Sequence, residues 1–139
     1  MITRRNSIQL LAAAAAGSAT RPSWADEKPK FPIGACDWSI KKQQDISAFD
    51  VAGEIGLEGL QVSFSTPDSE FDLRDAKVRE QYYRKVDATG IQLASLGMGI
   101  LNKMPLATHP ESIDWVDDVI AVIAAMSKEQ PDKAPNICL

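Results

Sequence analysis

The chain has 139 residues, and its first 25 carry three arginines and no acidic residue, which leaves 114 residues for a folded domain. Those 114 residues hold 12 basic and 19 acidic side chains. This acidic balance argues against a nucleic-acid surface, because phosphate binding needs clustered Lys and Arg. One histidine and two cysteines exclude a Cys/His zinc module and a disulfide scaffold. The length allows one domain and excludes a complete eight-stranded α/β barrel, which takes about 250 residues.

The N-terminus has the three parts of an export signal. Arg4 and Arg5 precede a short apolar segment, residues 8–19, and small residues up to Ala25 fit a cleavage site. The paired arginines indicate the twin-arginine route. The apolar segment is shorter than the roughly 20 residues that a membrane-spanning helix needs. We therefore expect residues 1–25 to be a twin-arginine-type signal cleaved after Ala25, with a periplasmic mature chain and no stable membrane span.

Three strand–helix units follow the signal. Their strands are short runs that are apolar or alternate between apolar and polar residues, and their helices repeat apolar residues every three or four positions. Strands separated by helices must be parallel, with right-handed crossovers. The sequence therefore predicts an α/β fold of about three parallel units. The predicted strands are 31–36, 59–64 and 91–96, and the predicted helices are 46–55, 74–88 and 110–126.

Local signals refine the helix ends and faces. Asp45 or Ser47 can cap the first helix, and Asp50 stands three residues after Ser47, which is the spacing of a capping box. Gly56 and Gly90 are placed to end the first two helices in left-handed caps. A stripe of four residues predicts the buried face of the third helix: Val116, Val119, Ile120 and Ile123.

The strand–helix pattern stops near Met126. Residues 127–139 contain Pro131 and Pro135, four charged residues and no apolar run. Because proline does not fit a central strand, the sequence predicts a disordered tail here instead of a fourth strand. A small, complete doubly wound domain is an alternative, but it needs at least one more strand than these three.

Three phrases of the sequence resemble the sugar phosphate isomerase/epimerase family, whose members have the xylose isomerase-like TIM barrel. The phrases are Gly34-Ala35-Cys36-Asp37-Trp38-Ser39, Ala52-Gly53-Glu54-Ile55-Gly56-Leu57-Glu58-Gly59-Leu60-Gln61-Val62-Ser63, and Ile91-Gln92-Leu93-Ala94-Ser95-Leu96 followed by Leu101-Asn102. The resemblance covers about residues 31 to 126. It implies that residues 26–126 are the N-terminal part of such a barrel and that residues 127–139 lie outside the family.

The resemblance also implies what the chain lacks. Enzymes of this family hold a divalent metal with Glu, Asp, His and Glu from later strands, and carboxylates move a proton at the carbon next to the sugar carbonyl. Those strands do not follow here. We therefore expect an incomplete TIM barrel, truncated before the metal-binding strands by a shortened reading frame or a gene-model error. We expect no cofactor in this chain, whereas a full-length family member would hold a divalent metal.

Four residues are predicted to bind substrate, because the site of such barrels lies at the C-terminal ends of the strands. Trp38 follows the first strand and would stack on a sugar face, and Asn102 follows the third strand. Gln61 and Ser63 lie in the second strand. Packing at the barrel rim is the alternative for Trp38, and polar filling of the barrel interior is the alternative for Gln61 and Ser63. Asp37 has the alternative of capping a turn.

The remaining chemistry-bearing residues predict no catalytic or metal site. His109 precedes Pro110 at a helix start, which indicates a solvated residue of the cap region. Cys36 lies in a predicted strand and Cys138 in the predicted tail. A disulfide between them after export and a buried thiol at Cys36 are both open readings.

Two functional hypotheses follow. In the first, the chain is part of a sugar isomerase or epimerase that acts by metal-dependent proton transfer, and this chain alone is inactive. In the second, it is a non-catalytic fragment that binds a sugar or another partner. The expected partners are a small-molecule sugar and a second copy of the chain, since a three-stranded sheet leaves two open edges.

Overall fold

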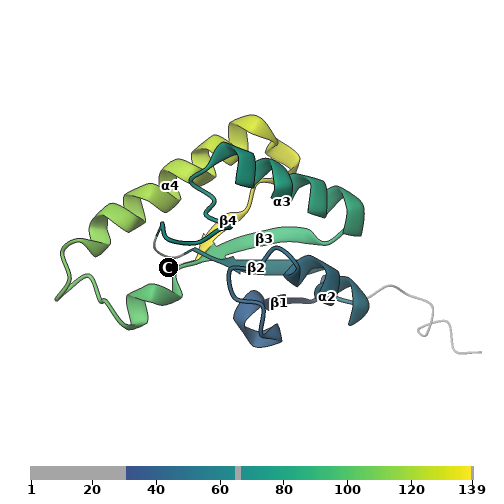
Figure 1. Ribbon diagram of the computed structural model, residues 1–139, viewed down its shortest axis with the longest axis horizontal. Helices are drawn as coiled ribbons and strands as arrows, with labels where there is room; N and C mark the ends of the chain where they lie inside the picture. The colour runs from purple at the N-terminus through teal and green to yellow at the C-terminus, as the bar shows by residue number, and fades with distance from the viewer. Residues whose placement is uncertain (1–30, 65–66, 139) are drawn as a thin grey trace, which may run out of the picture. The chain divides into compact units, whose positions relative to one another are not determined.

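The computed structural model describes residues 31–64 and 67–138. The chain divides into a unit of residues 1–31 and a unit of residues 32–139, and the fold is that of the second unit (Figure 1). The predicted export signal lies outside the described residues. The strands are β1 (Gly34–Cys36), β2 (Gly59–Ser63), β3 (Gln92–Gly97) and β4 (Asn136–Cys138), and the α-helices are α2 (Ala48–Glu54), α3 (Ala76–Thr89) and α4 (Ser112–Glu129).

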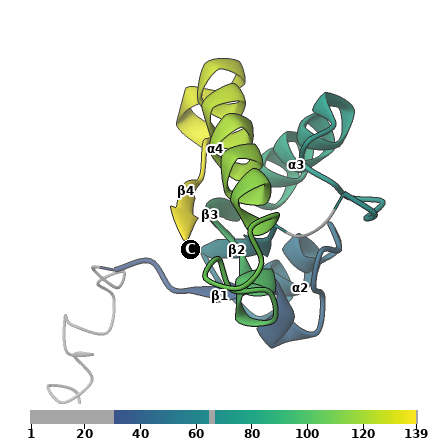
Figure 2. The same ribbon diagram turned by 90° about the vertical axis from the view of Figure 1, so that its left-hand side faces the viewer.

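All strand pairs are parallel, in the order β1-β2-β3-β4. Right-handed crossovers that always move to the next strand place their helices on one face of the sheet. Figures 1 and 2 show α3 and α4 on the same side of the strands. This arrangement confirms the predicted α/β class, with an open sheet of parallel strand–helix units. It does not fit a doubly wound domain, whose strand order reverses at a switch point.

The prediction of a disordered tail was wrong. Helix α4 continues to Glu129, a 3-10 helix (η5, Pro131–Lys133) follows, and β4 pairs with β3 in the register Ser95↔Asn136. The two prolines do not prevent this pairing, because Pro131 opens η5 and Pro135 directly precedes the strand. A parallel partner needs a long crossover, and α4 supplies it.

The helix ends follow their local chemistry. Gly56 adopts φ +79° after α2, Gly56 N–H donates to Gly53 O, and Leu57 N–H donates to Ala52 O, which together form a Schellman motif. Gly90 likewise ends α3 with φ +72°. The capping box predicted at Ser47 was wrong, since its side chain makes no cap hydrogen bond. The alternative residue, Asp45, accepts a hydrogen bond from Ser47 N–H at 2.8 Å.

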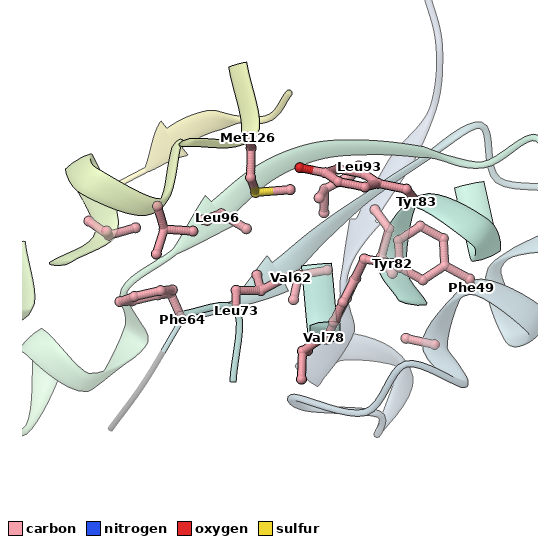
Figure 3. Close-up of a cluster of buried hydrophobic side chains, with 14 of the residues drawn as sticks. Phe49, Val62, Phe64, Leu73, Val78, Tyr82, Tyr83, Leu93, Leu96 and Met126 are labelled. Carbon is pink, nitrogen blue, oxygen red and sulfur yellow. The ribbon is translucent and has the colours of Figure 1, made fainter. Parts of the chain in front are cut away.

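The core lies between the sheet and the three helices (Figure 3). Phe49 of α2 meets Tyr82 of α3 edge to face, with ring centroids 5.8 Å apart. Leu60, Val62 and Phe64 come from the second strand and the residue after it. The buried stripe of α4 is Val119, Val122 and Met126, so Ile120 was wrongly predicted as buried and is 53% exposed. None of the described helices combines the length and apolarity needed to cross a bilayer.

The opposite side of the sheet, called the open face below, packs against no α-helix of the described residues. The strand registers and the alternation along each strand define its members. They are small or uncharged polar residues: Gly34, Cys36, Gly59, Gln61, Ser63, Gln92, Ala94, Ser95, Gly97 and Asn136. Ala94 and Ser95 share this face because the register shifts by one residue between Leu60 and Gln61.

Candidate functional site

Trp38 lies over the open face at the C-terminal end of the sheet. It belongs to the 3-10 helix η3 (Asp37–Ile40) that follows β1, yet its ring reaches the third strand. A Cβ placed on Gly97 would stand 3.2 Å from Trp38 Cη2 and 3.0 Å from Gln61 Cδ. Glycine at position 97 therefore makes room for both side chains. The indole stays 42% exposed, so one side of it faces solvent.

The turn that carries Trp38 is held by a buried carboxylate. Asp37 is fully buried and accepts three hydrogen bonds, from Gln44 N (2.9 Å), Ser63 N (2.8 Å) and Ser63 Oγ (2.7 Å). These bonds join the loop after β1 to the end of β2. Gln44 adopts a left-handed conformation to complete the turn. Asp37 thus caps a turn, the alternative reading of the sequence, and positions the residues beside it.

A row of side-chain hydrogen bonds crosses the open face beneath Trp38. The Cys36 thiol donates to Gln61 Oε1 at 2.8 Å, and Gln61 Nε2 donates to Ser95 Oγ at 2.9 Å. The row joins β1, β2 and β3 at matched register positions. It fixes the Gln61 side chain beside Gly97, where the Trp38 ring also reaches, so Gln61 supports the ring.

Two adjoining hollows lie at this edge. The first, of about 270 Å³, is lined by Trp38, Gln43, Gly99, Asn102 and Lys103. The second, of about 140 Å³, is lined by Gln43, Ser63, Phe64, Gly99, Ile100 and Lys103. They share three residues, namely Gln43, Gly99 and Lys103. We call them together the edge site.

The four predicted binding residues differ in whether they line the edge site. Trp38 and Asn102 line the same hollow. Ser63 borders the second hollow, but it is buried and its hydroxyl donates to Asp37. Gln61 lies below the indole and lines neither hollow.

Sequence reasoning missed two polar side chains of the edge site, those of Gln43 and Lys103. Lys103 directly follows the predicted Asn102, so its position after the third strand was a usable signal. Gln43 lies five residues beyond Trp38, and no local pattern marks it. Its place depends on the turn that Asp37 closes by binding Gln44 and Ser63.

The surroundings of the turn keep the phenol of Tyr82 neutral and the carboxylate of Asp45 ionised. The phenol of Tyr82 is buried, and its hydroxyl has no hydrogen-bond partner among the described residues. Burial raises the pKa of Tyr82 far above its usual value, and the negative charges of Asp37 and Asp45 add to this effect. Asp45 itself has a lowered pKa, chiefly because it accepts hydrogen bonds from Ser47.

The other side chains that could bind a metal ion do not cluster in the described residues. Across residues 31–64 and 67–138, no three His, Cys, Asp or Glu side chains are placed to hold one metal ion. His109 Nδ1 lies 3.0 Å from Thr108 Oγ1 in the turn before α4. Cys36 and Cys138 lie in the two outer strands, three strand spacings or about 14 Å apart. A disulfide within one chain needs Cα atoms within about 7 Å, so that reading of the cysteines was wrong.

No protein family model, curated protein or solved structure matches the chain. Its function must therefore be argued from the geometry of the edge site. That geometry offers one exposed aromatic face, two side-chain amides and one ammonium group.

Proposed function

We propose that the edge site binds a sugar or a similar polyol. The observation that carries the proposal is the Trp38 indole, whose Cη2 edge reaches Gly97 while the residue stays 42% exposed. An aromatic face covers the C–H side of a sugar ring, where hydrophobic contact is favourable. The C-terminal end of parallel strands is also where α/β folds place their ligands.

Polar groups beside the indole complement hydroxyls. The side-chain amides of Gln43 and Asn102 each offer two donors and a carbonyl acceptor, and Lys103 adds a charged donor. Hydroxyl groups both donate and accept, so amides suit them well. The described lining of the two hollows contains no carboxylate. We therefore propose binding by this chain and assign proton transfer to none of its residues.

A titration tests the proposal. Intrinsic tryptophan fluorescence would be followed while D-xylose or D-glucose 6-phosphate is added to the full chain. We expect a saturable change with a Kd of about 1 mM, typical of a small, solvent-open site. Trp38→Leu should abolish the response.

Trp115 of α4 provides the matched control, because it packs against the core and lines neither hollow of the edge site. Trp115→Phe should retain the saturable response of the unmodified chain. A response that survives Trp38→Leu and disappears in Trp115→Phe would rule out sugar binding at the edge site. Isomerase turnover by this chain alone would show that the proposal of binding without chemistry is wrong.

A further inference from the structure

The open face has the composition of a covered surface. None of its members is charged, although charged residues make up 24% of the chain. Ala94, Gln92 and Asn136 are nevertheless exposed in the described unit. A sheet face that remains in water usually carries charged and long polar side chains. Small and uncharged polar side chains instead fill the interior of a closed barrel.

Both edges of the sheet are equally unprotected. Strands β1 and β4 each pair on one side only among the described residues, and each has three residues without a charged side chain. Natural proteins block such edges with lysine, with proline inside the strand or with bulges. Here the register shift lies between β2 and β3, inside the sheet, and Pro135 lies before β4. Strands β1 and β4 can therefore each form backbone hydrogen bonds with a further strand.

We propose that two copies of this chain close into one eight-stranded parallel barrel. A two-fold axis along the barrel would place β4 of each copy beside β1 of the other, and these strands would run in the same direction. Eight parallel strands with helices outside form a closed barrel whose interior is packed with side chains. Four strands in the order β1-β2-β3-β4 with helices on one face supply half of it. The two pairings are identical by symmetry, so the assembly stops at two copies.

The assembly would complete the edge site. Both indoles would lie inside the same rim, because each Trp38 covers the C-terminal end of its open face. The hollow beside Trp38 and Lys103 would then gain a wall from the second copy. This pairing does not depend on sugar binding. A failed sugar titration would therefore not contradict the dimer, and a monomeric chain would not contradict sugar binding.

Light scattering after size-exclusion chromatography tests the assembly. The full chain should elute with twice its mass of 15.1 kDa. Ala94→Lys would place a charge inside the barrel, so it should halve the observed mass. Ala88→Lys makes the same change on an exposed position of α3 and should leave the mass unchanged. A full chain that stays monomeric at high concentration, or a mass that grows without limit, would overturn the proposal.

Hydrogen exchange identifies the surfaces that pair. Amides of residues 34–36 and 136–138 should exchange more slowly in the dimer than in Ala94→Lys, because both edges become paired. A dimer formed by stacking two open faces would bury Ala94 but leave those edge amides as fast as in the variant. That result would also overturn the closed barrel, as would a dimer that tolerates Ala94→Lys.

Discussion

The Asp37 side chain links the turn after β1 to the end of β2, two segments that contribute to the edge site. Its carboxylate has no exposed surface and satisfies two backbone N–H groups and one hydroxyl, on Gln44 and Ser63. Buried donors that lose their acceptor cost about 1–3 kcal/mol each before any repacking. The aspartate is therefore a structural requirement for the turn that presents Trp38 and Gln43.

We expect Asp37→Ala to lower the free energy of unfolding by about 3 kcal/mol, measured by urea denaturation. Asp37→Asn is the matched control. Its side-chain carbonyl oxygen can accept from both N–H groups at the Oδ2 position, and its amide can donate to Ser63 Oγ. Most of the stability should therefore return in the Asp37→Asn variant. Equal losses in both variants would show that the negative charge, and not the hydrogen-bond pattern, holds the turn.

At the scale of elements, α4 is tied to α3 at its last turn. Arg79, which is 8% exposed, donates to both oxygens of Glu129 at 3.0 and 2.6 Å and to two carbonyls before α3. Tyr83 Oη also donates to Glu129, at 2.9 Å. The Arg79 guanidinium lowers the pKa of Glu129 below its usual value. This cluster fixes the end of the helix that leads into β4.

Because the folded pKa of Glu129 is lowered, its carboxylate contributes stability above the ordinary Glu pKa, and the contribution is lost as the pH falls through the folded value. Glu129→Gln should therefore cost about 1 kcal/mol at pH 7, a modest figure because the side chain is partly exposed. The difference from the unmodified chain should shrink as the pH falls below the ordinary Glu pKa, and it should vanish once the pH lies below the lowered folded pKa.

The exposed pair of Glu80 and Arg84 on α3 provides the control for this pH series. Glu80→Gln should change the unfolding free energy little at pH 7 or at pH 3, since water screens that pair. A Glu129→Gln effect that is the same at pH 7 and pH 3 would mean that the charge of Glu129 contributes nothing.

The strand–helix units were predictable because the residue pattern that specifies each unit lies within its own stretch of sequence. Alternating apolar positions marked the strands, and Gly56 and Gly90 marked helix ends. Strand β4 was missed because three residues are too few to show a period. It is a strand because β3 offers a free parallel edge and α4 delivers the chain to it, which is a long-range cause.

The candidate site was also predictable only where local sequence position marked its residues. Trp38 and Asn102 were found because they directly follow strands, where ligand sites gather. The supporting role of Gln61 was not visible, because it depends on the Cys36 and Ser95 partners from neighbouring strands. Only register brings those three residues together, and register is set by tertiary packing.

For the whole molecule, the N-terminal signal gives a prediction independent of the fold. We expect the chain, expressed with its own leader in a bacterium, to be recovered from the periplasm with Asp26 as its first residue. Replacing Arg4 and Arg5 together by lysine should retain the chain in the cytoplasm with its leader. Cell fractionation and intact mass measure both results. Export of the lysine variant would assign the leader to the general secretory route.

The reach of Trp38 across to Gly97 also has a kinetic consequence. Two complete strand–helix units separate these residues in the chain, so the indole cannot find its place until β1, β2 and β3 are all paired. Contacts between residues so far apart in sequence form slowly, since the entropy of closing the loop is lost first. The binding surface is therefore among the last parts of the fold to mature, and a nascent chain becomes competent for ligand only after its third strand has docked.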